Sequence, residues 1–142
     1  MKLKNQTIVN SIQGIKILSE KELPYATTLK ISKNINILDE LLKEYNKEYR
    51  KLAEEYLDKE NGNFIKSDSG YLIKKDKEKE YSEKLSILNN FENDVNLYLI
   101  DSKELADIKI SAKTLLEIDF MIKDEQEDTE WHRYYLLHYL LF

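Results

Sequence analysis

The sequence predicts a mainly helical α+β protein, with an elongated helical hairpin or bundle around one long helix and a small antiparallel β element. Three observations support this class. Apolar residues recur at alternating intervals of four and three between Ile31 and Tyr56. One Pro and three Gly among 142 residues favour few turns and long regular elements. Residues 60–75 and 91–100 lose the helical period, which leaves room for short strands.

The long helix is predicted over residues 24–58. An apolar stripe with this spacing forms one face of an amphipathic helix. At about 1.5 Å per residue, a helix of about 35 residues is about 52 Å long, whereas a compact chain of this size has a diameter of about 40 Å. We therefore expect other helices to lie along it. The stripe consists of Ile31, Ile35, Leu38, Leu42, Tyr45, Tyr49, Leu52 and Tyr56.

Tyr45, Tyr49 and Tyr56 change the character of this stripe in its second half. Tyrosine suits a surface that meets another segment while its hydroxyl group stays near water. Two alternatives follow: these tyrosines are covered by a later part of the same chain, or they are contact residues in a homodimer.

A first helix is predicted over residues 5–22, with Asn5 as its cap. The pair Leu23 and Pro24 ends it, because Pro disfavours a helical conformation in the residue before it. A helical hairpin with the long helix should result. One face of the first helix carries Ile8, Ile12, Ile15 and Leu18 or Ser19.

Residues 60–75 predict a small β-hairpin, since short apolar pieces alternate with Gly, Asn and Ser. A third helix is predicted from Asp76, as its cap, to Asn90, with Tyr81, Leu85 and Leu88 facing inward. The first and third helices together would match the length of the long one and could line it end to end.

Residues 91–100 alternate apolar and polar side chains, which predicts one half-buried strand. A turn should follow over residues 101–107, and Ile108 and Ile110 suggest another short strand. Ser111 should cap a helix that includes Asp119. That carboxylate lies among apolar residues in the sequence, so it is either a functional acid or a carboxylate that accepts backbone hydrogen bonds.

We predict a single α+β domain over residues 1–123. Residues 124–142 form a distinct acidic and aromatic segment after it. The net charge of the chain is −5, and five acidic residues without a basic one in the segment 124–130 account for all of it. A nucleic-acid-binding face would instead gather Lys and Arg. An acidic strip suits a basic protein surface, or it is a solvated linker. The acidic residues are Asp124, Glu125, Glu127, Asp128 and Glu130.

The stretch 131–142 is apolar nearly all round, so as a short helix it must be buried on most sides, by its own domain or by another molecule. Its Trp, Tyr and Arg residues are the types that dominate binding hot spots. We predict a partner-binding segment that includes the five acidic residues. Its other members are Trp131, Arg133, Tyr134, Tyr135, Tyr139 and Phe142.

Chemical motifs are scarce. The chain has no Cys, which excludes disulfides, thiolate metal sites and Cys nucleophiles. His132 and His138 are six residues apart and would face different sides of a helix. We therefore predict no enzyme, no cofactor and no metal site. The sequence shows neither a signal-peptide core nor a run of 18 apolar residues, so a cytoplasmic protein without a membrane association is expected.

Several stretches resemble a family of small proteins of unknown function from phages and prophages of low-GC Gram-positive bacteria. The similarity covers about residues 1–123. Ala112 departs from the family, which has Pro after the capping Ser. The similar pieces are LPYATTLKISKNINILDELLKEYNKEYRKLAEEY, the Gly-containing hairpin, the helix that leads into an alternating strand, and IKISAKTLLEIDFMI.

The resemblance implies a phage accessory protein in the bacterial host cell, and it supplies no catalytic residues. We expect a non-enzymatic protein that binds a host protein or complex, such as a nucleic-acid-binding one, and inhibits a bacterial defence system in the manner of an anti-CRISPR protein. Direct nucleic-acid binding is not expected. The alternative is a phage assembly or structural accessory protein that acts as a homo-oligomer. A metal-dependent enzyme that uses His132 is a third hypothesis.

Overall fold

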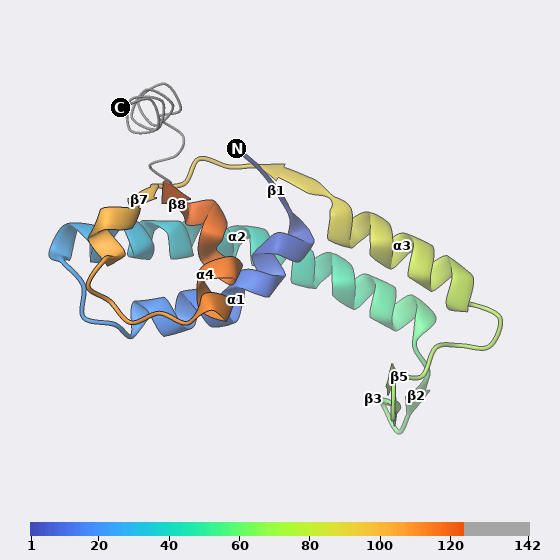
Figure 1. Cartoon of the computed structure of the whole chain (residues 1–142). Helices are drawn as coiled ribbons and strands as arrows, with labels where there is room; N and C mark the ends of the chain where they lie inside the picture. Colours follow the sequence, from blue (N-terminus) through green and yellow to red (C-terminus); the bar gives the residue numbers. More distant parts are fainter. Residues whose placement is uncertain (124–142) are drawn as a thin grey trace, which may run out of the picture. The chain divides into compact units, whose positions relative to one another are not determined.

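A computed structural model describes residues 1–123 of the protein (Figure 1). Helices dominate this part, so the predicted mainly helical α+β class is confirmed. The helices are α1 (Asn5–Ser19), α2 (Tyr25–Tyr56), α3 (Glu78–Asn90) and α4 (Ala112–Ile118). Two short 3-10 helices are η1 (Ser102–Leu105) and η2 (Asp119–Met121). No helix in this part of the chain is long and apolar enough to cross a membrane.

The strands are short and pair two by two. β1 (Lys2–Lys4) pairs antiparallel with β6 (Glu92–Asp94). β2 (Lys59–Glu60) and β3 (Asn63–Phe64) form one antiparallel hairpin, and β4 (Lys66–Ser67) and β5 (Gly70–Tyr71) form another. β7 (Ile100–Asp101) pairs parallel with β8 (Ile122–Lys123). The predicted antiparallel β element is thus present, accompanied by one parallel pair.

The chain divides into two compact units. Unit 1 combines Met1–Val9 with Ile37–Val95, and unit 2 combines Asn10–Asn36 with the described residues from 96 to 123. Helix α2 contributes residues to both. Because a compact unit is not necessarily an independent domain, the predicted single domain over residues 1–123 stays a prediction.

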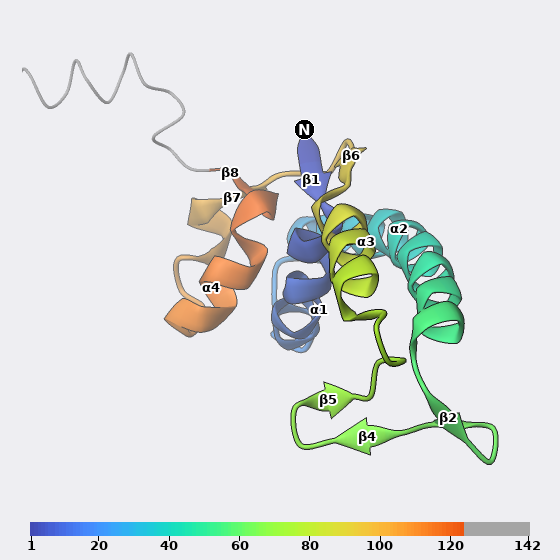
Figure 2. The ribbon, with the colours of Figure 1, turned by 90° about the vertical axis from the view of Figure 1, so that its right-hand side faces the viewer.

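Unit 1 has its core where α2 ends and α3 runs beside it. Ala53, Tyr56, Leu57 and Tyr81 are the buried members of this core. Leu52, Phe64, Ile73 and Leu85 pack against it. The segment that connects the two helices therefore contributes Phe64 and Ile73 to the same core. Figure 2 shows this segment, with its short strands, between α2 and α3.

Two details of unit 1 differ from the sequence predictions. The region 60–75 holds two hairpins instead of one, because Asn61 and Gly62 turn the chain with positive φ and Gly70 turns it again. Asp76 is not the cap of α3. It has φ 65°, a left-handed conformation that Asp tolerates, and Lys77 precedes the first helical residue instead.

Unit 2 contains the predicted helical hairpin of α1 and α2, with Pro24 in the connection. The buried residues of α1 in this unit are Ser11, Gly14 and Leu18. Ile12, predicted to face inward, is 48% exposed. The inner face is rotated because Gly14 lets α4 approach closely: a Cβ atom there would lie 3.0 Å from Ile118 Cγ2.

Residues 91–100 do not form one strand. Only Glu92–Asp94 and Ile100–Asp101 are strand residues, although the predicted alternation of exposed and less exposed side chains is present. Ile108 and Ile110 are not strand residues either, because this stretch has no sheet partner in the described part of the chain. Ser111 does cap α4, since its hydroxyl accepts a hydrogen bond from the Thr114 N–H group. Asp119 is exposed instead of enclosed by apolar side chains.

Candidate functional site

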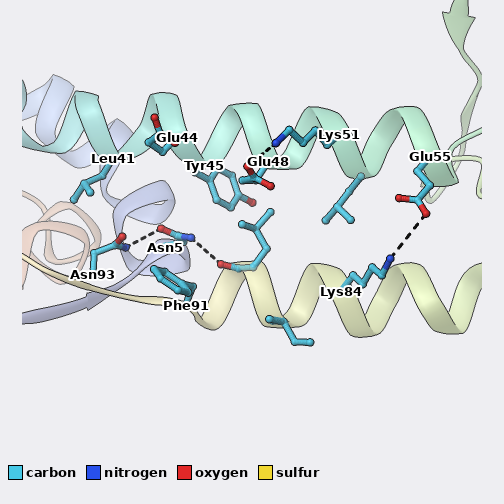
Figure 3. A pocket seen from close by; sticks show the side chains of 13 residues that line it. Asn5, Leu41, Glu44, Tyr45, Glu48, Lys51, Glu55, Lys84, Phe91 and Asn93 are labelled. Atoms are coloured by element: carbon cyan, nitrogen blue, oxygen red, sulfur yellow. Dashed lines mark hydrogen bonds and ion pairs between the residues drawn. The ribbon is translucent and has the colours of Figure 1, made fainter.

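Unit 1 has an open groove of about 640 Å³ between α2 and α3 (Figure 3). Side chains of both helices, the first residue of α1 and a residue of β6 line it. The apolar lining residues are Leu41, Tyr45, Leu52, Ile87, Leu88 and Phe91. The polar ones are Asn5, Glu44, Glu48, Lys51, Glu55, Lys84 and Asn93.

Two apolar side chains of the groove are mostly in contact with solvent. Ile87 is 70% exposed and Phe91 is 60% exposed. Phe91 directly follows α3 in an extended conformation, and Figure 3 shows its side chain beside the end of α3, below Asn5. Full burial of such a side chain contributes about 1.5–3 kcal/mol. Burial of these two side chains by an apolar partner would therefore favour binding in the groove.

Charged side chains of α2 and α3 form the rim. Lys51 Nζ lies 3.0 Å from Glu48 Oε1, and Lys84 Nζ lies 3.9 Å from Glu55 Oε1. Glu44 makes no ion pair with a described residue. Three carboxylates against two ammonium groups leave the lining with one net negative charge. The rim thus favours an apolar partner that also carries a cation near Glu44.

A network of amide hydrogen bonds closes one end of the groove. Asn5 Nδ2 donates to the Leu88 carbonyl oxygen at 2.8 Å. Asn93 Nδ2 donates to Asn5 Oδ1 at 2.8 Å and to the Leu3 carbonyl oxygen at 3.2 Å. These bonds attach the start of α1 and strand β6 to the end of α3. They hold this end of the groove in place without a ligand.

The tyrosines of the α2 stripe contact α3 of the same chain. The Tyr45 hydroxyl donates to Asn89 Oδ1 at 2.7 Å, and the Tyr45 and Tyr49 rings stack with centroids 6.1 Å apart. Tyr56 is only 2% exposed, and its ring lies 6.0 Å from that of Tyr81. In the structure, these tyrosines are therefore covered by a later part of the same chain, which was the first of the two alternatives. The predicted homodimer is not tested by them and stays a prediction.

Burial changes the acidity of two of these phenols. It raises the pKa of Tyr45, and the nearby Tyr49 adds to this effect. Burial also raises the pKa of Tyr81 to about 12, with further contributions from a hydrogen bond with Tyr49 and from the charges that Tyr49 and Tyr45 would carry. Both phenols stay neutral at ordinary pH and act as packing and hydrogen-bonding groups.

The predicted partner-binding residues between Asp124 and Phe142, together with His132 and His138, lie outside the described residues. Within residues 1–123, no three His, Asp or Glu side chains are placed to hold a metal ion. Among the predicted contact residues that the structure describes, which are Tyr45, Tyr49 and Tyr56, Tyr45 lines the groove.

Sequence reasoning did not find Ile87 and Phe91. Ile87 precedes the inward residue Leu88, so the apolar stripe of α3 is wider than its core contacts require. Phe91 belongs to the stretch 91–100 that the sequence predicts as a strand. An apolar residue outside the inward stripe of a helix was the signal that could have identified this surface.

The groove is suited to an apolar peptide segment, because it combines apolar walls, charged rims and one end that is held by hydrogen bonds. Comparisons with models of protein families, with curated proteins and with solved structures find no match for this chain.

Proposed function

We propose that this chain is a non-enzymatic protein-binding protein, and that the groove in unit 1 holds part of its target. The observation that carries the proposal is the exposure of Ile87 and Phe91 beside an open apolar groove. Apolar surface of this kind, bordered by charges, is typical of protein interaction sites.

The proposed target is a host component of a bacterial defence system, such as a nucleic-acid-binding effector. Two sequence features support this choice: the resemblance to phage and prophage proteins, and the five acidic residues in segment 124–130. A strip of carboxylates can occupy a basic channel that normally takes a nucleic acid. The protein would act in the cytoplasm of the host cell by covering a surface, which requires no catalytic group.

Affinity capture from a host lysate tests this function. The chain, the groove variant Phe91→Glu and the control variant Leu116→Glu are used side by side. Leu116 is 78% exposed and lies on α4 in unit 2, so the control introduces the same charge at another exposed apolar position that does not line the groove. We expect one host protein to be captured by the chain and the control, and at least tenfold less by Phe91→Glu. Equal capture by all three would contradict the proposal.

A second arm tests the acidic segment. Replacing Asp124, Glu125, Glu127, Asp128 and Glu130 by their amides removes five negative charges. If the target presents a basic surface, capture should fall and should lose its dependence on salt concentration. A charge-neutral variant that captures the same protein equally well at all salt concentrations would exclude mimicry of a nucleic acid.

A further inference from the structure

We propose that the groove of unit 1 binds residues 131–142 of a second copy of this chain. Two copies would exchange these segments, so that each groove receives the segment of the other copy. This inference concerns the purified chain without a host protein. It uses the same groove as the proposed function, so the segment of the second copy occupies the groove until a host target displaces it.

The length of the groove fits this segment. The residues of α2 that line it run from Leu41 to Glu55, which corresponds to about 21 Å along a helix axis. The sequence pattern predicts a helix for residues 131–142, and twelve helical residues extend over about 18 Å. A helix laid along a groove between two other helices is a common mode of peptide recognition.

The chemistry of the segment also fits. Residues 131–142 contain five aromatic residues, four leucines and no acidic residue, and Arg133 is their one permanently charged side chain. The groove offers apolar walls, one net negative charge and a carboxylate, Glu44, that makes no ion pair with a described residue. Arginine is the cation that pairs best with a carboxylate. An apolar helix with one cation matches an apolar groove with one spare anion.

Surface area favours exchange between two copies. A buried aromatic side chain contributes about 150–250 Å², so the aromatic residues of two exchanged segments would bury about 1,500 Å² or more. Stable interfaces bury about 1,200–2,000 Å². A two-fold arrangement fills both grooves in one association. The five negative charges in the connecting residues 124–130 repel one another and favour an extended linker. An extended linker favours binding of residues 131–142 to the groove of a second copy over binding to the groove of their own copy.

Disulfide trapping tests the inference, because the chain has no native Cys. Phe91→Cys and Leu140→Cys are placed in separate full-length chains, which are mixed and mildly oxidised. We expect a disulfide-linked heterodimer at least tenfold more abundant than with the control pair Leu116→Cys and Leu140→Cys. Equal yields would overturn the inference. So would a disulfide confined to a single chain when Phe91→Cys and Leu140→Cys are combined in one molecule.

Light scattering supplies a measurement without cysteines. The unaltered chain should be a dimer at micromolar concentration, and Phe91→Glu or Leu140→Glu should shift it to the monomer, while Leu116→Glu should leave the dimer intact. A concentration-independent monomer for the unaltered chain would also overturn the inference. These results are obtained without a host lysate, so they stand apart from success or failure of target capture.

Discussion

The side-chain amide of Asn34 pairs with the backbone of Tyr98 as a neighbouring strand would. Asn34 Nδ2 donates to the Tyr98 carbonyl oxygen at 2.9 Å, and Asn34 Oδ1 accepts from the Tyr98 N–H group at 2.7 Å. Asn34 is fully buried. Because buried backbone groups need partners, one helix residue supplies the hydrogen bonds that a sheet would otherwise give to this extended stretch of unit 2.

Replacing Asn34 by Leu should destabilise the protein strongly. The apolar side chain would leave the Tyr98 N–H and carbonyl groups without these partners, and two such losses are expected to lower the free energy of unfolding by about 2–4 kcal/mol. Urea denaturation followed by circular dichroism measures the change. Asn36→Leu is the control, because Asn36 lies on the same helix and is exposed. Equal losses in the two variants would show that the amide pairing has no special weight.

Gly14→Ala should destabilise the protein, although Ala normally stabilises a helix relative to Gly by up to about 1 kcal/mol. A Cβ atom at residue 14 would lie 2.9 Å from Glu117 Cβ, an atom attached directly to the α4 backbone. Helix α4 would have to move, and such overpacking typically costs about 1–3 kcal/mol. Thermal denaturation should therefore show a lower melting temperature. Gln13→Ala, at an exposed position of the same helix, should leave it nearly unchanged.

Gly14 and Ile12 also show where the sequence was sufficient and where it was not. The long helix could be predicted because one apolar period continues from Ile31 to Tyr56, and its observed end, Tyr56, is two residues before the predicted one. The inner face of α1 could be predicted only in part: Ile8 and Leu18 are buried as predicted, whereas the small residues Ser11 and Gly14 are buried without an apolar pattern to mark them. A periodic pattern of apolar residues does not reveal a small residue whose role is to let two helices approach closely.

The strand predicted over residues 91–100 fails for a related reason. Its alternation is local, but the group that bonds its backbone is Asn34, which is far away in the sequence. The groove was predictable only in part. Tyr45 belongs to the periodic stripe, whereas Phe91 lies in the groove because α3 ends at Asn90. The end of a helix is harder to place from the sequence than its middle.

The core of unit 1 should depend on the ring of Tyr56 much more than on its hydroxyl group. Tyr56→Ala empties a buried site and is expected to cost about 3–5 kcal/mol of unfolding free energy. Tyr56→Phe removes the hydroxyl group, which donates to Glu80 Oε2 at 3.3 Å and also forms a hydrogen bond with Lys84; this should cost about 1 kcal/mol. Chemical denaturation of both variants gives the ratio. Tyr25→Ala provides the control, because Tyr25 is exposed on the same helix; a Tyr25→Ala loss as large as that of Tyr56→Ala would contradict this account.

Glu104 should make the stability of the protein fall in acid. Partial burial acts to raise the pKa of its carboxyl group, but hydrogen bonds from Lys30, the Asp101 N–H group and Thr27 outweigh burial and lower the pKa below its ordinary value of 4.5. These bonds measure 3.0, 2.7 and 2.9 Å.

Because the pKa of Glu104 is lower in the folded than in the unfolded state, its stabilising contribution is complete above pH 4.5 and is lost as the pH falls through the folded-state pKa. Glu104→Gln should lower the free energy of unfolding at pH 7 and make it decline less steeply in acid. Denaturation curves measured from neutral pH down to acid test this. Asp107→Asn, an exposed carboxylate in the same connection, should retain the steep decline, and parallel pH profiles for Glu104→Gln and the unaltered chain would refute the role given to Glu104.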